Sequence, residues 1–234
     1  IGPANMGGRV TDIDGIPGDP STFYVSGADG GLFKTTNGGV TFQELFTDQR
    51  AYSVGAVAIA PSDHNVLWLG SGEGDPRNSV GYGNGVYRST DGGESWEHLG
   101  LEGTERIKRI VVDPRDPDVA CVCALGKEWG ANEDRGVFKT TDGGKNWRKV
   151  LYIDEDTGCS DLDIDLSNPR NMYAGMWTFR RKPWRFDDGG KETAAYRSKD
   201  GGETWEKIVK GLPEGPMARI GIAVAQSQPN TVYM

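Results

Sequence analysis

The feature that most constrains this sequence is a short motif that recurs four times at nearly equal spacing. Each copy places a hydroxyl two positions before an aspartate or asparagine, two glycines directly after it and an aromatic ring five positions after it. The acidic or amide residues are Asn37, Asp91, Asp142 and Asp200, so consecutive copies lie 54, 51 and 58 residues apart. A fixed period in this range indicates one repeated unit that buries its apolar face against its neighbours.

Each motif is flanked by short segments with the alternation of a half-buried strand. An apolar-aromatic-basic triplet precedes it, as in Val86-Tyr87-Arg88, and a second short segment follows. The motif itself is then a hairpin turn, because its Asp or Asn can accept backbone N–H bonds and its glycines can take positive φ. The aromatic residue is expected to hold the turn against the sheet. We therefore assign a structural role to Asn37, Phe42, Asp91, Trp96, Asp142, Trp147, Asp200 and Trp205.

A second pattern precedes each motif, consisting of two apolar segments joined by a turn rich in Asp, Asn and Pro, as in residues 110–121 and 162–173. With the two strands around the motif this gives four strands per repeat, which is the blade of a β-propeller. The sequence thus predicts an all-β fold, a β-propeller of four-stranded antiparallel blades. The predicted blades are 7–47, 53–100, 107–151 and 160–210, followed by a partial blade at 219–234.

A propeller has to close its ring so that no long strand edge stays unpaired. Four blades and part of a fifth do not close neatly, so we expect this chain to be a segment of a larger propeller of about seven or more blades. The alternative is a complete small ring in which residues 219–234 complete the first blade.

Composition excludes several classes of protein. Glycine contributes 35 of 234 residues, about twice its usual share of ~7%, which argues against a helical bundle. The net charge of −8 would repel a phosphate backbone, so we expect no nucleic-acid partner. Since no apolar run approaches the ~18 residues of a membrane-crossing helix, we expect no membrane span.

The three cysteines cannot all pair within one chain. Buried free thiols are the simplest expectation, while a link from Cys121 or Cys123 to Cys159 stays open if neighbouring strands bring them together. The sequence shows neither a zinc-ligand spacing nor a Cys/His nucleophile pair. We therefore predict no metal and no cofactor.

The four motifs resemble the Asp-box, Ser/Thr-x-Asp-x-Gly-x-Thr/Ser-Trp, of bacterial neuraminidase repeats (BNR repeats), with mild departures at Asn37, Phe42 and Asn146. Families with such boxes include sialidases, two-propeller xyloglucanases, sortilin-type receptor domains and photosystem II assembly factors. The resemblance implies a secreted, periplasmic or cell-surface location. It marks a fold and not a reaction.

The first repeat, in residues 6–13 and 24–34, resembles the amino-terminal blade of the xyloglucanase family. In that family an Asp before Gly-Gly-aromatic-basic serves as a catalytic carboxylate, and the resemblance implies this role for Asp29, with a second carboxylate from a second propeller. The alternative is that Asp29 is a plain turn residue. A sialidase would need an arginine triad, for which Arg9, Arg106 and Arg219 stand near blade starts, but its usual Arg-Ile-Pro opening is missing.

The long insertions fall in connections that share one face of the predicted propeller. The insertion of the second repeat carries a carboxylate pair, Glu73 and Asp75, suited to acid-base chemistry or cation binding, or simply to a solvated loop. Trp129, in the third, could stack on a sugar or cover a loop. The fourth interleaves aromatic and basic side chains that suit a flat ligand or a partner surface, or that fold back over the rim. Its candidate ligand-binding residues are Trp177, Arg180, Arg181, Trp184 and Arg185.

Two functions follow as hypotheses. The first is an extracytoplasmic binding or scaffolding propeller that presents this loop face to a protein or polysaccharide ligand, with further blades supplied by the same polypeptide. The alternative is a xyloglucanase-like glycoside hydrolase that uses Asp29 in carboxylate acid/base catalysis. Hydrolysis would need a second carboxylate at ~5–5.5 Å for retention or ~6.5–9.5 Å for inversion.

Overall fold

The computed structural model describes residues 9–234, so positions 7 and 8 of the first predicted blade lie outside it. It contains five antiparallel sheets, of which four are blades whose strands form a meander in chain order and the fifth has two strands. The predicted fold class, an all-β propeller of four-stranded blades, is confirmed. The first blade holds β1 (Val10–Ile16), β2 (Asp19–Gly27), β3 (Gly31–Thr35) and β4 (Gln43–Leu45). The second holds β5 (Val54–Ile59), β6 (Leu67–Ser71), β7 (Val86–Ser89) and β8 (Glu97–His98).

The remaining strands continue the same order. The third blade holds β9 (Ile107–Val112), β10 (Ala120–Ala124), β11 (Gly136–Thr140) and β12 (Arg148–Leu151). The fourth holds β13 (Thr157–Ile164), β14 (Met172–Lys182), β16 (Ala194–Ser198) and β17 (Glu206–Lys207), with β15 (Arg185–Asp188) paired to the far end of β14. A two-stranded pair, β18 (Ala223–Val224) and β19 (Val232–Tyr233), follows. Within residues 9–234 the only helical element is a single 3-10 turn, η1 (Glu102–Thr104), and no helix is long and apolar enough to cross a membrane.

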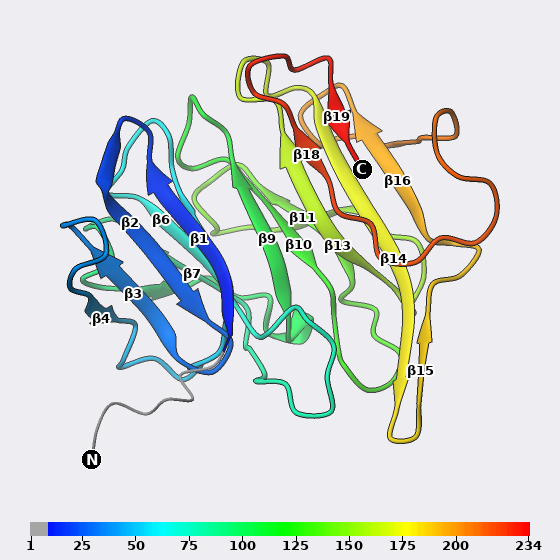
Figure 1. Ribbon diagram of the computed structural model, residues 1–234, viewed down its shortest axis with the longest axis horizontal. Coiled ribbons are helices and arrows are strands. Elements are labelled where there is room, and N and C mark those ends of the chain that lie inside the picture. The colour runs from blue at the N-terminus through cyan, green and yellow to red at the C-terminus, as the bar shows by residue number, and fades with distance from the viewer. Residues whose placement is uncertain (1–8) are drawn as a thin grey trace.

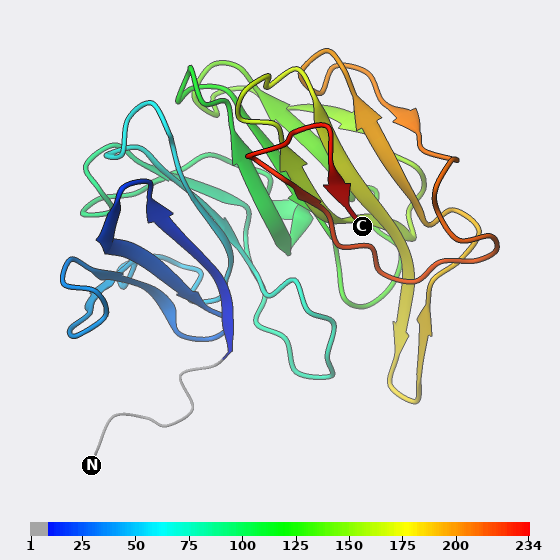
Figure 2. The same ribbon diagram turned by 45° about the horizontal axis from the view of Figure 1, so that its top comes forward.

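The blades stand side by side like the ribs of a fan, and the first strand of each blade contacts the first strand of the next (Figures 1 and 2). The apolar core therefore lies between the sheets. Tyr24 and Leu32 of the first blade pack against Leu67 of the second, and Trp68 of the second packs against Val122 of the third. The same arrangement repeats between the third and fourth blades and between the fourth blade and β18.

The four box turns, residues 35–42, 89–96, 140–147 and 198–205, share one hydrogen-bond pattern. In the second, the Ser89 hydroxyl accepts the N–H of Gly93 at 2.8 Å, and the Asp91 carboxylate accepts the N–H of Ser95 at 2.9 Å. Hydrogen bonds from Ser95, first its hydroxyl and then its N–H, lower the pKa of Asp91 to about 2. The turn is also tied to the preceding blade, because Tyr24 donates its hydroxyl to the Gly92 carbonyl at 3.1 Å.

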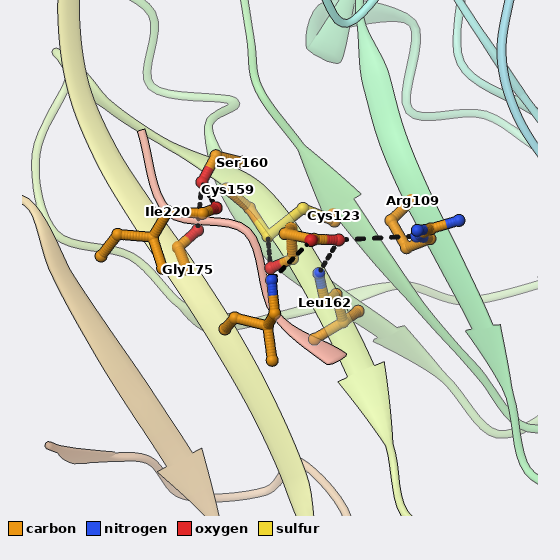
Figure 3. Close-up of a disulfide and its surroundings, with 9 residues drawn as sticks. Arg109, Cys123, Cys159, Ser160, Leu162, Gly175 and Ile220 are labelled. Carbon is orange, nitrogen blue, oxygen red and sulfur yellow. Dashed lines mark hydrogen bonds and ion pairs between the residues drawn. A yellow bond between two sulfur atoms is a disulfide. The ribbon is translucent and has the colours of Figure 1, made fainter. Parts of the chain in front are cut away.

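A disulfide joins Cys123 on β10 to Cys159 on β13, so the expectation of three free thiols is wrong for this pair (Figure 3). The alternation of β10 points Cys121 and Cys123 to the fourth blade, and the inner strand of that blade brings Cys159 to a Cα–Cα distance of 5.0 Å from Cys123. Beside it, the Ser160 hydroxyl donates to the carbonyl of Ile220 at 2.9 Å (Figure 3). Cys121 remains a buried thiol, and burial raises its pKa to about 12.

Aspartates on two of the inner strands, β1 and β13, bond the first blade to the second and the fourth blade to the β18 pair. Asp14 accepts the N–H of Ile59 at 2.7 Å, and Asp163 accepts the N–H of Val224 at the same distance. Burial raises the pKa of both carboxyls. These side-chain hydrogen bonds join the inner strand of one sheet to the inner strand of the next.

Candidate functional site around Asp29

The connections between second and third strands and those between consecutive blades lie at one end of the meanders, opposite the box turns. We call this end the loop face. The β6–β7 loop (residues 72–85) and the β14–β15 hairpin both project from it (Figures 1 and 2). All of the ligand-binding and catalytic candidates from the sequence belong to these connections, whereas the structural box residues lie at the other end.

Asp29 lies in the tight turn that joins β2 to β3, and its side chain is exposed. The β6–β7 loop packs directly against it. A Cβ on Gly81 would come within 2.5 Å of the Asp29 carboxylate and 2.6 Å of the Ser53 side chain, so only glycine fits at position 81. No salt bridge within residues 9–234 involves Asp29, which leaves an exposed carboxylate in a crowded and well-defined setting.

The two loop carboxylates predicted as a pair instead form ion pairs with cations from other parts of the propeller. Glu73 is fully buried and accepts the Nε–H of Arg9 at 2.8 Å, while its second oxygen has no partner within residues 9–234. Asp75 accepts a hydrogen bond from Arg219 at 2.6 Å and another from Lys108 at 3.4 Å. Burial opposes the charge of Asp75, but the Arg219 and Lys108 cations outweigh it and hold its pKa below the usual range.

Three cations from outside the β6–β7 loop, Arg9, Lys108 and Arg219, therefore balance the charges of its two carboxylates. The Arg9 pKa is raised, chiefly by its hydrogen bond to Glu73 and further by the charges of Asp29 and Asp75. The arginines of the sialidase alternative are each engaged in this way, since Arg106 forms a fully buried pair with Glu128. They do not converge as free cations that would clamp a substrate carboxylate.

The fourth insertion is a hairpin, because β14 runs on to Lys182 and pairs with β15. Trp177 is only 2% exposed, stacks on Phe179 at 4.7 Å and donates its indole N–H to Asp188 at 2.9 Å. The guanidinium of Arg135 lies 4.3 Å from the centre of the Phe179 ring, on the apolar base of the hairpin. This part of the insertion thus follows the alternative in which the aromatic side chains pack over the rim.

The remaining candidates of this region are distributed along the hairpin. Arg180 pairs with Asp156 and Arg185 with Asp187. Arg181 donates to the side chain of Asn78 in the β6–β7 loop at 3.0 Å, and its backbone bridges to the half-buried Trp129. Trp184, at the tip, is 81% exposed.

Two exposed tyrosines near Asp29 were not singled out from the sequence. Tyr52 is 62% exposed, and its carbonyl accepts the N–H of Gly31 at 2.9 Å, just after Asp29. Tyr82 is 53% exposed and directly follows Gly81. The available signal was the Gly-Tyr-Gly sequence at 81–83, which places an aromatic ring between two residues without side chains.

The sequence and fold are similar to those of known proteins. The Sortilin-Vps10 family model, described as "Sortilin, neurotensin receptor 3", matches residues 84–229. Xyloglucanase Xgh74A of Acetivibrio thermocellus is 27% identical over 202 residues, which cover 78% of this chain and 23% of that protein. A xyloglucanase of Paenibacillus sp. is 28% identical over 210 residues, covering 80% of this chain and 19% of its own length.

Solved structures of glycoside hydrolases share the fold. An ancestral GH74 enzyme superposes with a TM-score of 0.67 at 19% identity, covering 88% of this chain and 26% of the enzyme. The GH74 xyloglucanase from Xanthomonas campestris gives a TM-score of 0.64 at 21% identity, covering 88% of this chain and 31% of the enzyme. The chain thus spans less than a third of the length of these relatives. Because the family model matches more than half of the sequence, the chain belongs to the Sortilin-Vps10 family of β-propellers.

Proposed function

We propose that this chain supplies the loop face of an extracytoplasmic propeller that binds polysaccharide, with Asp29 at the centre of the binding surface. The observation that carries the proposal is the exposed carboxylate of Asp29, which forms no salt bridge within residues 9–234 and lies against Gly81 of the β6–β7 loop. The exposed Tyr52 and Tyr82 belong to the two segments that contact the Asp29 turn. A carboxylate accepts hydrogen bonds from sugar hydroxyls, and an aromatic ring stacks on the C–H face of a pyranose. The names of the xyloglucanase relatives support a glycan over a protein partner.

The proposed location outside the cytoplasm is supported by the disulfide. Cys123 and Cys159 are bonded in the core between two blades, and structural disulfides of this kind persist in oxidising compartments. Secretion or export to the periplasm or cell surface is part of the proposal.

Hydrolysis is the second candidate, favoured by the absence of a salt bridge to Asp29 within residues 9–234, which leaves its carboxylate available for chemistry. Glu73 and Asp75 are neutralised by Arg9, Lys108 and Arg219, so neither is a ready partner. A catalytic role for Asp29 therefore requires another carboxylate within ~5–9.5 Å of it across the bound sugar.

One experiment separates the two candidates. The full chain and its Asp29→Asn variant are compared for retardation in xyloglucan-containing gels and for release of reducing sugar. Asp63→Asn is the matched control, because Asp63 is exposed in the β5–β6 turn at the opposite end of the blade.

Loss of retardation in Asp29→Asn alone supports a binding surface centred on Asp29. Retained retardation with loss of sugar release supports the hydrolase. If the unmodified protein is not retarded by xyloglucan or by other neutral polysaccharides, the proposed function is wrong.

A further inference from the structure

A cavity of about 730 Å³ lies on the loop face between the first and second blades, beside Asp29 but outside its turn. Its walls come from three separate connections, namely the linker that leaves β4, the β6–β7 loop and the segment that follows β8. The polar and aromatic side chains that line it include Asp48, Arg50, Tyr82, Asn84, His98 and Glu102. A volume of this size lies in the range of small-molecule sites, ~300–1,000 Å³.

Backbone strain concentrates in the two linkers that form its walls. Within residues 9–234 the non-glycine residues with positive φ are Phe46 at 67°, Leu101 at 63° and Glu105 at 51°. Phe46 starts the first linker, and the other two flank η1 in the second. Such conformations persist only where the surroundings enforce them, and they cluster at ligand sites. Here Phe46 is buried and held edge-on against Tyr87 at 4.8 Å.

A fixed hydrogen-bond network orients the polar groups of the cavity. His98 Nε2 lies 2.7 Å from the Asn84 carbonyl and therefore carries the donated proton, while the ring packs against Tyr87 at 4.8 Å. The Tyr87 hydroxyl donates to Asn84 Oδ1 at 2.8 Å. His98 Nδ1 lies 3.8 Å from the Glu102 carboxylate. Imidazole and amide are thus positioned in advance of any ligand.

The chemistry of this lining selects the class of ligand. It offers two carboxylates, one guanidinium, two amides and an imidazole, so acceptors and donors are both present and the charge disfavours an anion. Tyr82 adds a half-exposed aromatic residue to the lining. Mixed donors and acceptors beside an aromatic face suit a neutral ring that carries several hydroxyl groups.

We propose that this cavity is a saccharide subsite that takes one neutral pyranose unit of a chain bound across Asp29. The inference rests on the proposed polysaccharide binding and adds a second contact point to it. The two points are adjacent because Tyr82 follows Gly81, which packs against the Asp29 carboxylate. A bound chain passes from Asp29 over Tyr82 into the cavity.

The test uses the full chain with Tyr82→Ala and with the isosteric Glu102→Gln, and titrates neutral xyloglucan and cello-oligosaccharides by calorimetry. The matched control is Glu97→Gln, an exposed residue of β8 one position before His98. We expect an increase in Kd of about tenfold for Tyr82→Ala, which removes a stacking contact, and of several-fold for Glu102→Gln, which replaces a hydrogen bond to a charged acceptor by a weaker neutral one. The control binds like the unmodified protein.

Hydrogen exchange locates the ligand independently of the variants. Occupation of the cavity protects residues 48–51 and 98–102. If the unmodified protein binds an oligosaccharide, but both variants retain its Kd and these segments are not protected, the cavity is not a subsite and the proposed function still stands. If the unmodified protein binds none of the oligosaccharides, both proposals are wrong. Circular dichroism of Tyr82→Ala excludes misfolding, and Glu102→Gln carries the test if that variant does not fold.

Discussion

Arg109 on β9 donates a hydrogen bond to Asp12 on β1 at 2.9 Å, so one guanidinium of the third blade reaches the first. Its Nε lies 3.5 Å from Asp161 on β13, and the same side chain thereby also contacts the fourth blade (Figure 3). Asp12 and Asp161 in turn accept backbone N–H bonds from Val57 and Ile222 of the blades that follow them. Arg109 is therefore the shared cation of the inner strands.

Replacement of Arg109 by methionine should lower the free energy of unfolding by about 1–2 kcal/mol, because it leaves two partly buried carboxylates without a cation, while the exposure of Arg109 limits the loss. The measurement is urea unfolding at pH 7. Arg115→Met is the control, since Arg115 is exposed and its one ion pair within the described residues 9–234 is with Asp113 in its own turn. Equal stability of the two variants would show that the bridge contributes nothing.

Reduction of the Cys123–Cys159 bond should destabilise the protein by about 2–4 kcal/mol, since it releases a cross-link between positions 36 residues apart. The check is thermal unfolding with and without reductant, and the double variant Cys123→Ala/Cys159→Ala should match the reduced protein. Thiol titration in denaturant without reductant should find one thiol per chain, that of Cys121. Three thiols would contradict the disulfide.

The box carboxylates should make folding sensitive to acid. Hydrogen bonds, first from the side chains of Ser95 and Asn146, lower the pKa values of Asp91 and Asp142 from their ordinary value of 3.8 to about 2. A depressed folded-state pKa stabilises the protein above the unfolded-state value, and this contribution is lost as the pH falls from about 4 to 2. Urea unfolding between pH 6 and pH 2.5 should show this loss, with a shallower slope for Asp91→Asn.

The matched control for that slope is Asp14→Asn, because burial raises the pKa of Asp14. A raised carboxyl pKa acts in the opposite direction, since it favours the folded state at low pH and the benefit is lost as the pH rises through the folded-state value. This variant should therefore lose stability more steeply than the unmodified protein as the solution is acidified. An identical pH profile for both variants would contradict the assignment.

Glu73→Gln should loosen the β6–β7 loop without unfolding the blades. The change removes the charge that pairs with Arg9, and it places amide donors in a fully enclosed site where one Glu73 oxygen has no hydrogen-bond partner within residues 9–234. Limited proteolysis should cut residues 72–85 faster, and Asp29 should lose its fixed neighbour at Gly81. Glu94→Gln in a box turn, where the side chain is exposed, should leave the cleavage rate unchanged.

The sequence was most informative where structure is local. Box turns and four-stranded repeats depend on residues within a few positions of one another, and the fold class followed from them. The partners of Glu73 and Asp75 could not be predicted, since Arg9 and Arg219 lie 64 and 144 residues away along the chain. Which cysteine bonds to Cys159 depends on how the third and fourth blades are aligned, which is not a local property of the sequence. The burial of Trp177 likewise depends on the pairing of β14 with β15. The cavity beside Tyr82 forms from three connections that carry no common motif.

The apolar clusters between the sheets have a consequence for how this architecture tolerates change. Each inner blade contributes residues to two apolar clusters, one on either side of its sheet. No single sheet therefore has a hydrophobic core that is independent of its neighbours. Deleting a whole repeat would strip two neighbours at once, whereas lengthening a connection leaves every cluster intact. We therefore expect changes of sequence and length to be tolerated best in the connections that carry Asp29 and Tyr82. Ligand specificity can change there while the blades stay the same.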